Sequence, residues 1–204
     1  MECYIVGAGE FFGFEELPSP EDYVIAADGG YAVCRAKGVV PDCILGDFDS
    51  LGWMPEEGNV IRVPVEKDDT DLMLAVKKGL EQGCAVFHIY GGTGGRLDHT
   101  VANLQALLYL ADRGVRGWLH DGSGKFTALR NDTLVLPARK EGIFSVFAMD
   151  GDAKGVCIRG GQYPLEDGTL HESIALAVSN HFVGREVTIS VRDGALLVGV
   201  MDEN

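Results

Sequence analysis

The first 121 residues alternate short apolar runs with two longer segments of helical periodicity, and this alternation constrains the fold more than any other feature of the chain. Several of the short runs are apolar on both faces, as strands buried within a parallel sheet are. Strands are predicted to begin at Glu2, Tyr23, Cys43, Val60, Cys84 and Arg116. The pattern predicts an α/β domain with a mostly parallel sheet and right-handed crossover connections.

Two helices are predicted between these strands, over residues 70–83 and 96–114. Apolar side chains recur at helical spacing in both, so one face of each helix is expected to pack against the sheet. The predicted buried face of the first helix consists of Leu72, Ala75, Val76, Gly79 and Leu80. The predicted buried face of the second consists of Leu97, Val101, Leu104, Leu108 and Ala111. Gly114 gives the second helix a natural stop.

The remainder of the chain, after about Asp121, shows no helical pattern. It consists of short runs rich in Val, Ile and Phe, separated by turn pairs such as Asp150-Gly151 and Asp193-Gly194. Such a series predicts an antiparallel sandwich or barrel. We therefore expect two domains: an α/β domain over residues 1–123, and an all-β sandwich domain over residues 124–204.

Charge limits the partners that the chain can have. Its 204 residues include 17 Lys and Arg against 31 Asp and Glu, a formal net charge of −14. So acidic a protein is expected to repel nucleic acid and anionic membranes. It would repel a phosphate ligand too, unless a metal ion or local cations lay between them, so a metal is predicted at any phosphate site.

The cysteines and the N-terminal segment indicate the cellular compartment in which the protein is expected. The five cysteines are odd in number and show no CxxC spacing, which favours buried free thiols in a reducing cytoplasm. The first residues lack the basic start and long apolar run of a signal peptide, and no apolar stretch is long enough to span a membrane. A cytoplasmic protein is expected.

Four clusters of glycine and charged residues stand between the predicted elements, each of them after a strand. In open α/β sheets, ligands bind outside the carboxyl ends of the strands, so the four clusters are expected to share one site. They are Ala27-Asp28-Gly29-Gly30, Gly46–Ser50, Lys67–Asp71 and Gly91–His99.

The second cluster carries Asp47 and Asp49, which alternate along a segment expected to be extended. Their carboxylates would then face one side, with Phe48 turned into the core. Carboxylates so close oppose each other's ionisation unless a cation lies between them, and Mg²⁺ prefers such oxygen ligands. An ordinary solvated turn explains this pair about equally well.

The third cluster places three acids within four positions. Thr70 or Asp69 as an N-cap of the following helix explains one or two of the polar residues. Three acids are more than helix capping needs, and this favours metal or nucleotide binding. Asp71 would then be a further metal ligand, and Lys67 would offset phosphate charge.

The fourth cluster is a glycine-rich loop that leads into a helix. Glycines allow a ligand to approach the backbone closely, and free amides at a helix N-terminus bind anions. Arg96 adds a forked donor suited to phosphate. A tight turn needs only one or two glycines, so this loop favours a ligand. The glycines are Gly91, Gly92, Gly94 and Gly95. P-loop, zinc and lipase-type signatures are absent from the sequence.

In this order, the clusters resemble the thiamine pyrophosphokinase family. The resemblance extends into the second half, through GVCIRGGQYPLEDGTL from Gly155 and AVSNHFVGREVTISVRDGALLV from Ala177, and so covers nearly the whole chain. It implies an enzyme that transfers pyrophosphate from ATP to the thiamine hydroxyl, giving thiamine diphosphate and AMP. It further implies a Mg-ATP-binding α/β domain, a β-sandwich that contributes to thiamine binding, and a homodimer.

The resemblance also assigns roles to residues. Asp47, Asp49 and Asp71 correspond to Mg²⁺ ligands, and Ser179 and Asn180 to contacts with thiamine. Around the nucleotide, metal or reacting hydroxyl, it places Asp28, Asp68, Thr70, Arg96, Asp98 and Asn103. In the expected mechanism, Arg96 and the amides of the glycine loop stabilise developing charge. Asp71 and Asp98 are both candidates to accept the hydroxyl proton.

One departure concerns Tyr163, where some relatives carry Trp. A tyrosine ring can stack on thiamine with less area, and a strand-edge position explains it equally well. Two alternative functions remain open: a diphosphokinase for another alcohol such as a pterin, or a sensor of nucleotide or thiamine without catalysis. The density of metal-type aspartates argues against the sensor.

Overall fold

A computed structural model describes residues 1–48, 53, 58–64, 66 and 68–202 of the chain. The described chain forms two compact units, each with its own core. Unit 1 consists of Met1–Ala106 and Val115–Gly122, and unit 2 of Leu107–Gly114 and Ser123–Asn204. The assignment of separate functions to residues 1–123 and 124–204 stays a prediction.

Unit 1 contains a parallel sheet in the strand order β4-β3-β2-β1-β5-β6. All six strands predicted in the first half are present. They are β1 (Glu2–Val6), β2 (Tyr23–Ala27), β3 (Cys43–Gly46), β4 (Val60–Arg62), β5 (Val86–Tyr90) and β6 (Arg116–Asp121). The parallel α/β character predicted for this part of the chain is confirmed.

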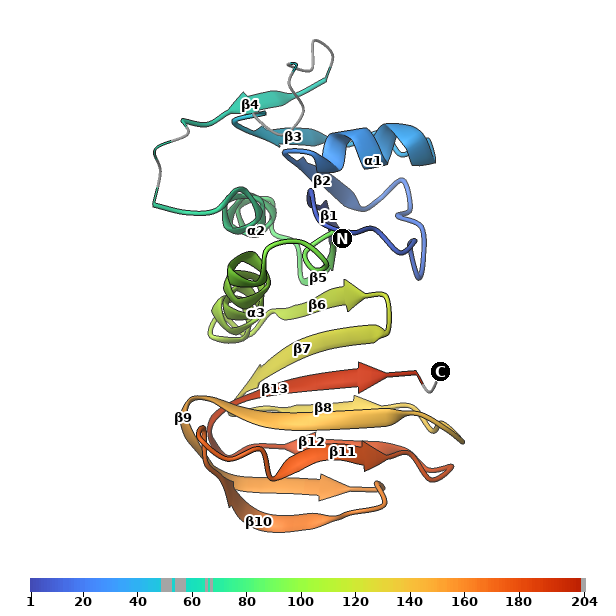
Figure 1. Cartoon of the computed structure of the whole chain (residues 1–204), viewed down its shortest axis with the longest axis vertical. Helices are drawn as coiled ribbons and strands as arrows, with labels where there is room; N and C mark the ends of the chain where they lie inside the picture. The colour runs from blue at the N-terminus through green and yellow to red at the C-terminus, as the bar shows by residue number, and fades with distance from the viewer. Residues whose placement is uncertain (49–52, 54–57, 65, 67, 203–204) are drawn as a thin grey trace. The chain divides into compact units, whose positions relative to one another are not determined.

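Helices cover the sheet of unit 1: α1 (Gly30–Lys37), α2 (Asp71–Glu81) and the first part of α3 (Leu97–Ala111), whose residues from Leu107 on belong to unit 2. The first of them was not predicted, because it is only eight residues long and begins in a glycine pair typical of a loop. Gly30 is required there because a Cβ would lie 1.8 Å from the carbonyl oxygen of Val6. Figure 1 shows α2 and α3 on one face of the strands and α1 on the other.

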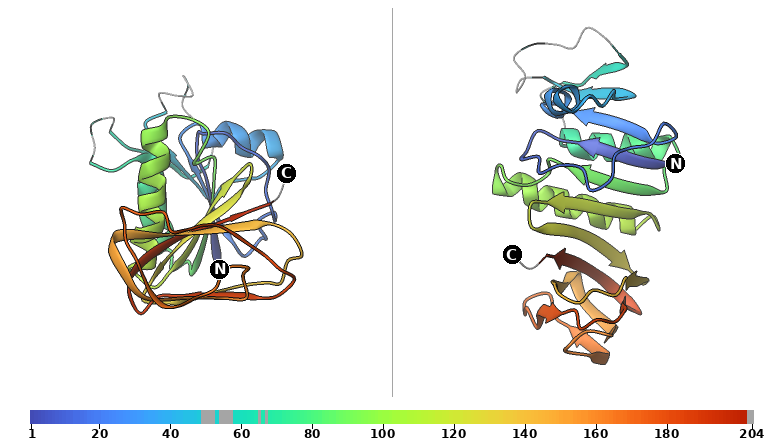
Figure 2. Two further views of the ribbon diagram at one scale, coloured as in Figure 1. Left: turned by 60° about the horizontal axis from the view of Figure 1, so that its bottom comes forward. Right: turned by 90° about the vertical axis from the view of Figure 1, so that its right-hand side faces the viewer.

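The segment between β1 and β2, residues 7–22, crosses the face of the sheet that carries α1. The right-hand view of Figure 2 shows it as the dark blue trace in front of the strands. Phe11 and Phe14 of this segment pack against Tyr4, Val24 and Tyr90 of the strands. The segment therefore shields a sheet face that α2 and α3 do not reach.

The predicted buried face of α2 is confirmed for Leu72, Ala75, Val76 and Gly79, and Leu80 is half-buried. The face predicted for α3 is wrong for Leu97, which is 78% exposed, and Val101, which is 51% exposed. The other three residues of that face are half-buried: Leu104, Leu108 and Ala111. The fully buried side chains are Asn103, Ala106, Leu107 and Leu110. These four also follow helical spacing, but their face includes a polar residue, so apolar periodicity favoured a face rotated away from it.

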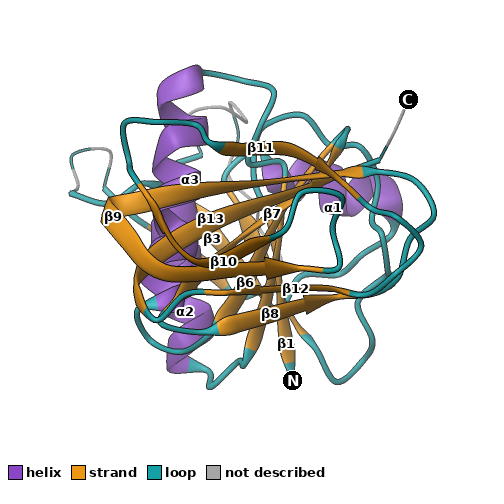
Figure 3. Ribbon diagram, turned by 90° about the horizontal axis from the view of Figure 1, so that it is seen from below, coloured by secondary structure: helices purple, strands orange, loops and turns teal. Residues whose placement is uncertain are grey.

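Unit 2 is antiparallel, and the described residues after α3 contain no helix. Its strands are β7 (Gly124–Arg130), β8 (Thr133–Leu136), β9 (Ile143–Arg159), β10 (Leu165–Leu170), β11 (Ala177–His181), β12 (Val187–Ser190) and β13 (Asp193–Met201). The long strand β9 belongs to two groups. Its first half lies between β13 and β11, and its second half between β10 and β12 (Figure 3). The all-β character predicted for this part is confirmed.

The ends of β1 and β5 approach each other more closely than side chains allow. The amide of Gly7 donates to the carbonyl of Tyr90, and the amide of Gly9 to that of Gly91, both at 2.8 Å. A Cβ on Gly9 would lie 2.4 Å from the Thr93 carbonyl oxygen. Glycine is therefore required at this position by packing between two stretches of backbone.

We expect Gly9→Ala to lower the free energy of unfolding by about 1–3 kcal/mol, because neither backbone segment can move away without breaking these hydrogen bonds. Gly95→Ala is the matched control, since a Cβ there has nothing within 4 Å. The control should change stability by no more than about 0.5 kcal/mol. Urea unfolding of both variants tests this, and equal stabilities would contradict it.

Candidate functional site

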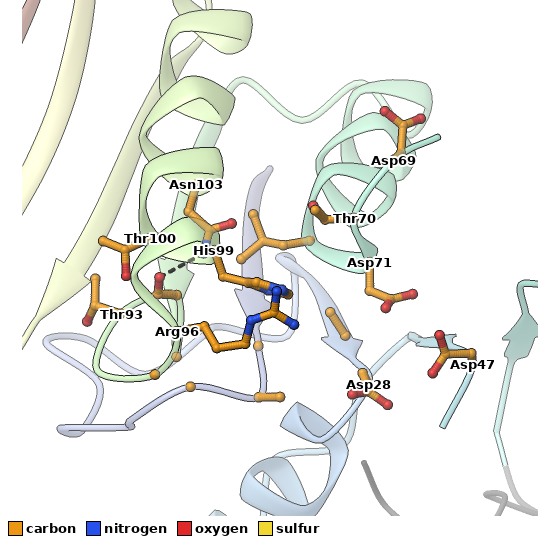
Figure 4. A pocket seen from close by; sticks show the side chains of 18 of the residues that line it. Asp28, Asp47, Asp69, Thr70, Asp71, Thr93, Arg96, His99, Thr100 and Asn103 are labelled. Carbon is orange, nitrogen blue, oxygen red and sulfur yellow. Dashed lines mark hydrogen bonds between the residues drawn. The ribbon is translucent and has the colours of Figure 1, made fainter. Parts of the chain in front are cut away.

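A pocket of about 440 Å³ opens at the carboxyl ends of β1, β2, β3 and β5, between the N-terminal ends of α2 and α3 (Figure 4). All of its lining belongs to unit 1. The structure brings most of the predicted site residues together there. Those that line it are Asp28, Asp47, Asp68, Thr70, Asp71, Gly92, Gly95, Arg96 and Asn103.

Other predicted residues lie elsewhere. Asp98 and Gly94 are outside the pocket lining, and Asp49 and Lys67 fall outside the described residues. Three predicted thiamine contacts belong to unit 2: Tyr163, Ser179 and Asn180.

Carboxylates from separate elements gather at one end of the pocket. Asp28 follows β2, Asp47 follows β3 and Asp71 begins α2, and Figure 4 shows the three side chains projecting toward the same space. Asp28 is the most constrained of them: it is buried, has a φ of +49°, and its Oδ1 has no hydrogen-bond partner among the described residues. A buried carboxylate oxygen without a donor is costly unless a ligand or ion completes it.

The backbone around Asp47 differs from the extended segment that was expected. Phe48 has a φ of +64°, in the left-handed region that most residues avoid. Its ring is buried against Val6, Ala26, Cys34 and Ile44, as predicted. Because the backbone turns at Phe48, strand alternation does not apply after Asp47.

The N-terminus of α2 is organised by Thr70, whose hydroxyl accepts a hydrogen bond from the amide of Met73 at 3.2 Å. Thr70 is therefore the N-cap of α2, one of the two residues predicted for that position. Asp69 instead forms an ion pair with Lys77, in the second turn of the helix, at 2.6 Å. The cap and the ion pair leave Asp71 in the first turn, where the helix dipole favours a carboxylate facing the pocket.

The glycine loop after β5 is held from α3. The buried amide of Asn103 donates from Nδ2 to the carbonyl oxygen of Gly92 at 2.7 Å. A Cβ on Gly92 would lie 2.6 Å from Leu119 and 3.2 Å from the Asn103 amide. Part of the glycine requirement in this loop is therefore set by packing against α3 and β6.

Arg96 reaches into the pocket while paired with Asp98. Its Nη2 and Nε lie 2.5 Å and 3.1 Å from the two carboxylate oxygens. These hydrogen bonds lower the pKa of Asp98 and raise that of Arg96. Asp98 also accepts a hydrogen bond from the amide of His99. The carboxylate therefore orients the guanidinium and is a weaker proton acceptor than an unpaired one.

The predicted thiamine contacts in unit 2 are held in place by local hydrogen bonds. Asn180 is buried; its Oδ1 accepts from the amides of Tyr163 and His181, and its Nδ2 donates to the carbonyl of Tyr163. Ser179 has a φ of +59°, and its amide donates to the hydroxyl of Ser145. The Tyr163 side chain remains 60% exposed. Asn180 therefore fixes the chain around Tyr163, whose ring is open to a ligand.

Several lining residues were missed or given no firm role by the sequence reasoning. They are Gly7, Ala8, Gly9, Ala27, Asp69, Leu72, Thr93, His99 and Thr100. The small and apolar members carry no chemical signal, so only their position after a strand could have indicated them.

Among the described residues, no three His, Cys, Asp or Glu side chains lie close enough together to hold a metal ion. With Asp49 outside that part of the chain, the ligand set of Asp47, Asp49 and Asp71 stays a prediction. None of the described helices has the length and apolar character needed to cross a membrane.

Comparison with known proteins is consistent along the whole chain. The family model described as "Thiamin pyrophosphokinase, catalytic domain" matches residues 14–119, and "Thiamin pyrophosphokinase, vitamin B1 binding domain" matches residues 133–196. A Bacillus subtilis protein named thiamine pyrophosphokinase is 26% identical over 181 residues, covering 85% of each chain.

Solved structures share the fold. The crystal structure of thiamine pyrophosphokinase from Bacillus subtilis superposes with a TM-score of 0.89 at 22% identity, covering 100% of both chains. That of thiamin pyrophosphokinase from Geobacillus thermodenitrificans gives a TM-score of 0.83 at 26% identity, covering 100% of this chain and 98% of the other. The family matches, together with a carboxylate-lined pocket where the sequence placed it, show that the chain belongs to the thiamine pyrophosphokinase family.

Proposed function

We infer that the protein transfers pyrophosphate from ATP to the hydroxyl of thiamine, and we propose that the pocket of unit 1 is where the triphosphate reacts. The activity follows from membership of the family, whose catalytic-domain model includes most of the pocket. The observation that supports placing the triphosphate in this pocket is the convergence of carboxylates, an arginine and a glycine loop at the strand ends. A pterin diphosphokinase or a non-catalytic sensor is not favoured, since both halves of the chain match this family.

The charge of the pocket is the physical reason to propose a divalent cation. Its described lining includes five aspartates and a single arginine, and one of the aspartates is neutralised by Lys77. A triphosphate entering this field would be repelled without a counter-ion. The donors are carboxylate oxygens, which Mg²⁺ prefers, and the unpartnered Oδ1 of Asp28 suits an oxygen site that an ion completes.

We propose that Asp47, Asp49 and Asp71 hold Mg²⁺, with Asp28 beside them. When bound, the ion would neutralise phosphate charge and polarise the β-phosphorus. The chain's own groups supply the rest: Arg96, oriented by Asp98, binds phosphate oxygens, and the glycine loop lets the backbone approach them. Thiamine's hydroxyl oxygen then attacks the β-phosphorus, the bridging bond between the α- and β-phosphates breaks, and AMP leaves.

Asp71 is the better of the two candidates for accepting the hydroxyl proton. It lines the pocket, whereas Asp98 lies outside the lining and has a lowered pKa because of its hydrogen bonds with Arg96. We propose that thiamine contacts the exposed ring of Tyr163 and the Ser179 region of unit 2. Homodimerisation and a cytoplasmic location remain part of this proposal.

The function is tested by AMP release. Purified protein with ATP and Mg²⁺ should form AMP when thiamine is added and not when thiamine is omitted or replaced by a pterin alcohol. Chelation of the metal should abolish the reaction. AMP formation independent of thiamine, or an unchanged rate without divalent cations, would refute the corresponding part of the proposal.

Asp71→Asn should lower kcat by about 100-fold or more, because it removes a metal ligand and the candidate proton acceptor together. Asp98→Asn should cost no more than about tenfold, since its loss only frees Arg96. Both variants should keep the wild-type circular dichroism spectrum. A larger loss for Asp98→Asn would assign the proton transfer to Asp98 instead.

A further inference from the structure

A chain of ionisable groups, joined by two hydrogen bonds and one ion pair, crosses the sheet face of unit 1 opposite α2 and α3, outside the pocket. Glu2 Oε2 lies 2.9 Å from His88 Nε2, and His88 Nδ1 lies 3.2 Å from His120 Nε2. The other nitrogen of His120, Nδ1, lies 3.4 Å from Glu15 Oε2. We call these four residues the histidine relay. It joins β1, β5 and β6 to the segment 7–22.

Aromatic rings enclose the relay. Tyr4 stacks on His88 with ring centroids 4.9 Å apart, and Tyr90 stacks on His120 at 4.2 Å with an interplanar angle of 10°. Phe14 packs edge-on against Tyr90 at 4.9 Å. Burial raises the pKa of Tyr90, so its hydroxyl stays neutral. In such surroundings a hydrogen bond to a charged group is stronger than in water.

The tautomers of the two rings decide which of these contacts are hydrogen bonds. The contact of His88 with Glu2 needs a proton on Nε2, and that of His120 with Glu15 needs one on Nδ1. The contact between the rings needs a proton on one of the two facing nitrogens. All three contacts can carry a hydrogen together only when the two rings hold three protons.

The segment that Glu15 belongs to begins at the pocket. Gly7, Ala8 and Gly9 line the pocket, and the amide of Glu10 donates to the carbonyl of Thr93 at 2.9 Å. Five residues after Glu10, the same segment is held to the sheet by the ion pair of Glu15 with His120. A short stretch of chain therefore runs from the rim of the pocket to the relay.

We propose that His120 is a positioning residue for the nucleotide pocket: by binding Glu15, it holds the segment 7–22 so that Gly7–Gly9 keep the rim in the shape that accepts ATP. The proposal rests on the proposed function of the pocket. The relay has no part in the proposed transfer reaction, so shaping the pocket would be a separate role for it.

Other ionisable groups face the relay from the elements around it. The segment 7–22 contributes Glu16 and Asp22, whose charges act on Tyr4, and Asp22 also accepts a hydrogen bond from the amide of Glu2. Strand β6 places Arg116 on the same face as His120, by alternation along the strand. Tyr4 and Tyr90 remain neutral across the range in which imidazoles titrate, because burial raises the pKa of both.

The test compares three variants of the full-length protein. Glu15→Gln removes the relay's charge from the segment, and His120→Phe keeps a ring on Tyr90 but removes both nitrogens. Glu21→Gln is the matched control, the same change on an exposed residue of the same segment. The measurements are the Kd for Mg-ATP without thiamine, KM and kcat for ATP between pH 5.5 and 8.5, and hydrogen exchange of amides 10–22.

Glu15→Gln and His120→Phe should raise the Kd and KM for ATP about three- to tenfold, the effect of losing one partly exposed charge-assisted hydrogen bond. Their kcat should stay within about twofold, and amides 10–22 should exchange faster. Wild type and Glu21→Gln should bind Mg-ATP with the same affinity, because Glu21 is exposed and makes no contact with the relay in the described structure.

Unchanged ATP affinity with faster exchange would show that the relay anchors the segment without shaping the pocket, and would overturn the proposal. Unchanged exchange in both variants would show that the ion pair does not hold the segment, with the same consequence. A fall in kcat alone would also overturn it. Because Mg-ATP binding is measured without thiamine, failure of the relay is distinguishable from failure of the transfer reaction, which the AMP assay reports.

Discussion

The contact between the ends of β1 and β5 is the constraint on which the site depends. Backbone amides of Gly7 and Gly9 bond to carbonyls of Tyr90 and Gly91 at a separation that leaves no room for a Cβ. This contact extends the sheet beyond its regular strands, and its glycines line the pocket. Carboxylates from β2, β3 and α2 can then converge on one space, because the strands that deliver them are parallel and end at the same edge.

The predicted site residues divide into those whose side chains are open to a ligand and those that hold the chain in place. Asn103, Asp98 and Asn180 all belong to the second group in this structure. Each is bound to the backbone or side chain beside a residue that is open to a ligand. Replacing one of them would therefore affect activity through the group that it orients. Residues that hydrogen-bond to the ligands of a metal or catalytic centre act in the same way.

The sequence was sufficient to predict all six strands of unit 1, the antiparallel character of unit 2, and most of the pocket, because apolar periodicity and strand-end clusters report directly on parallel sheets. It failed where backbone geometry or packing decided the outcome. The left-handed turn at Phe48 and the buried face of α3 around Asn103 depend on neighbours distant in sequence. The relay escaped notice for the same reason, since Glu2, Glu15, His88 and His120 meet only in the folded sheet.

Strand order in unit 2 has a consequence for how the protein is made. β13 lies between β7 and β9 in the sheet, yet it follows every other strand of the unit in sequence. During synthesis, β7 and the first half of β9 therefore emerge with a vacant position between them, exposing unpaired edges until the ribosome delivers residues 193–201. Nascent chains stalled before that point should need chaperone protection that released chains do not.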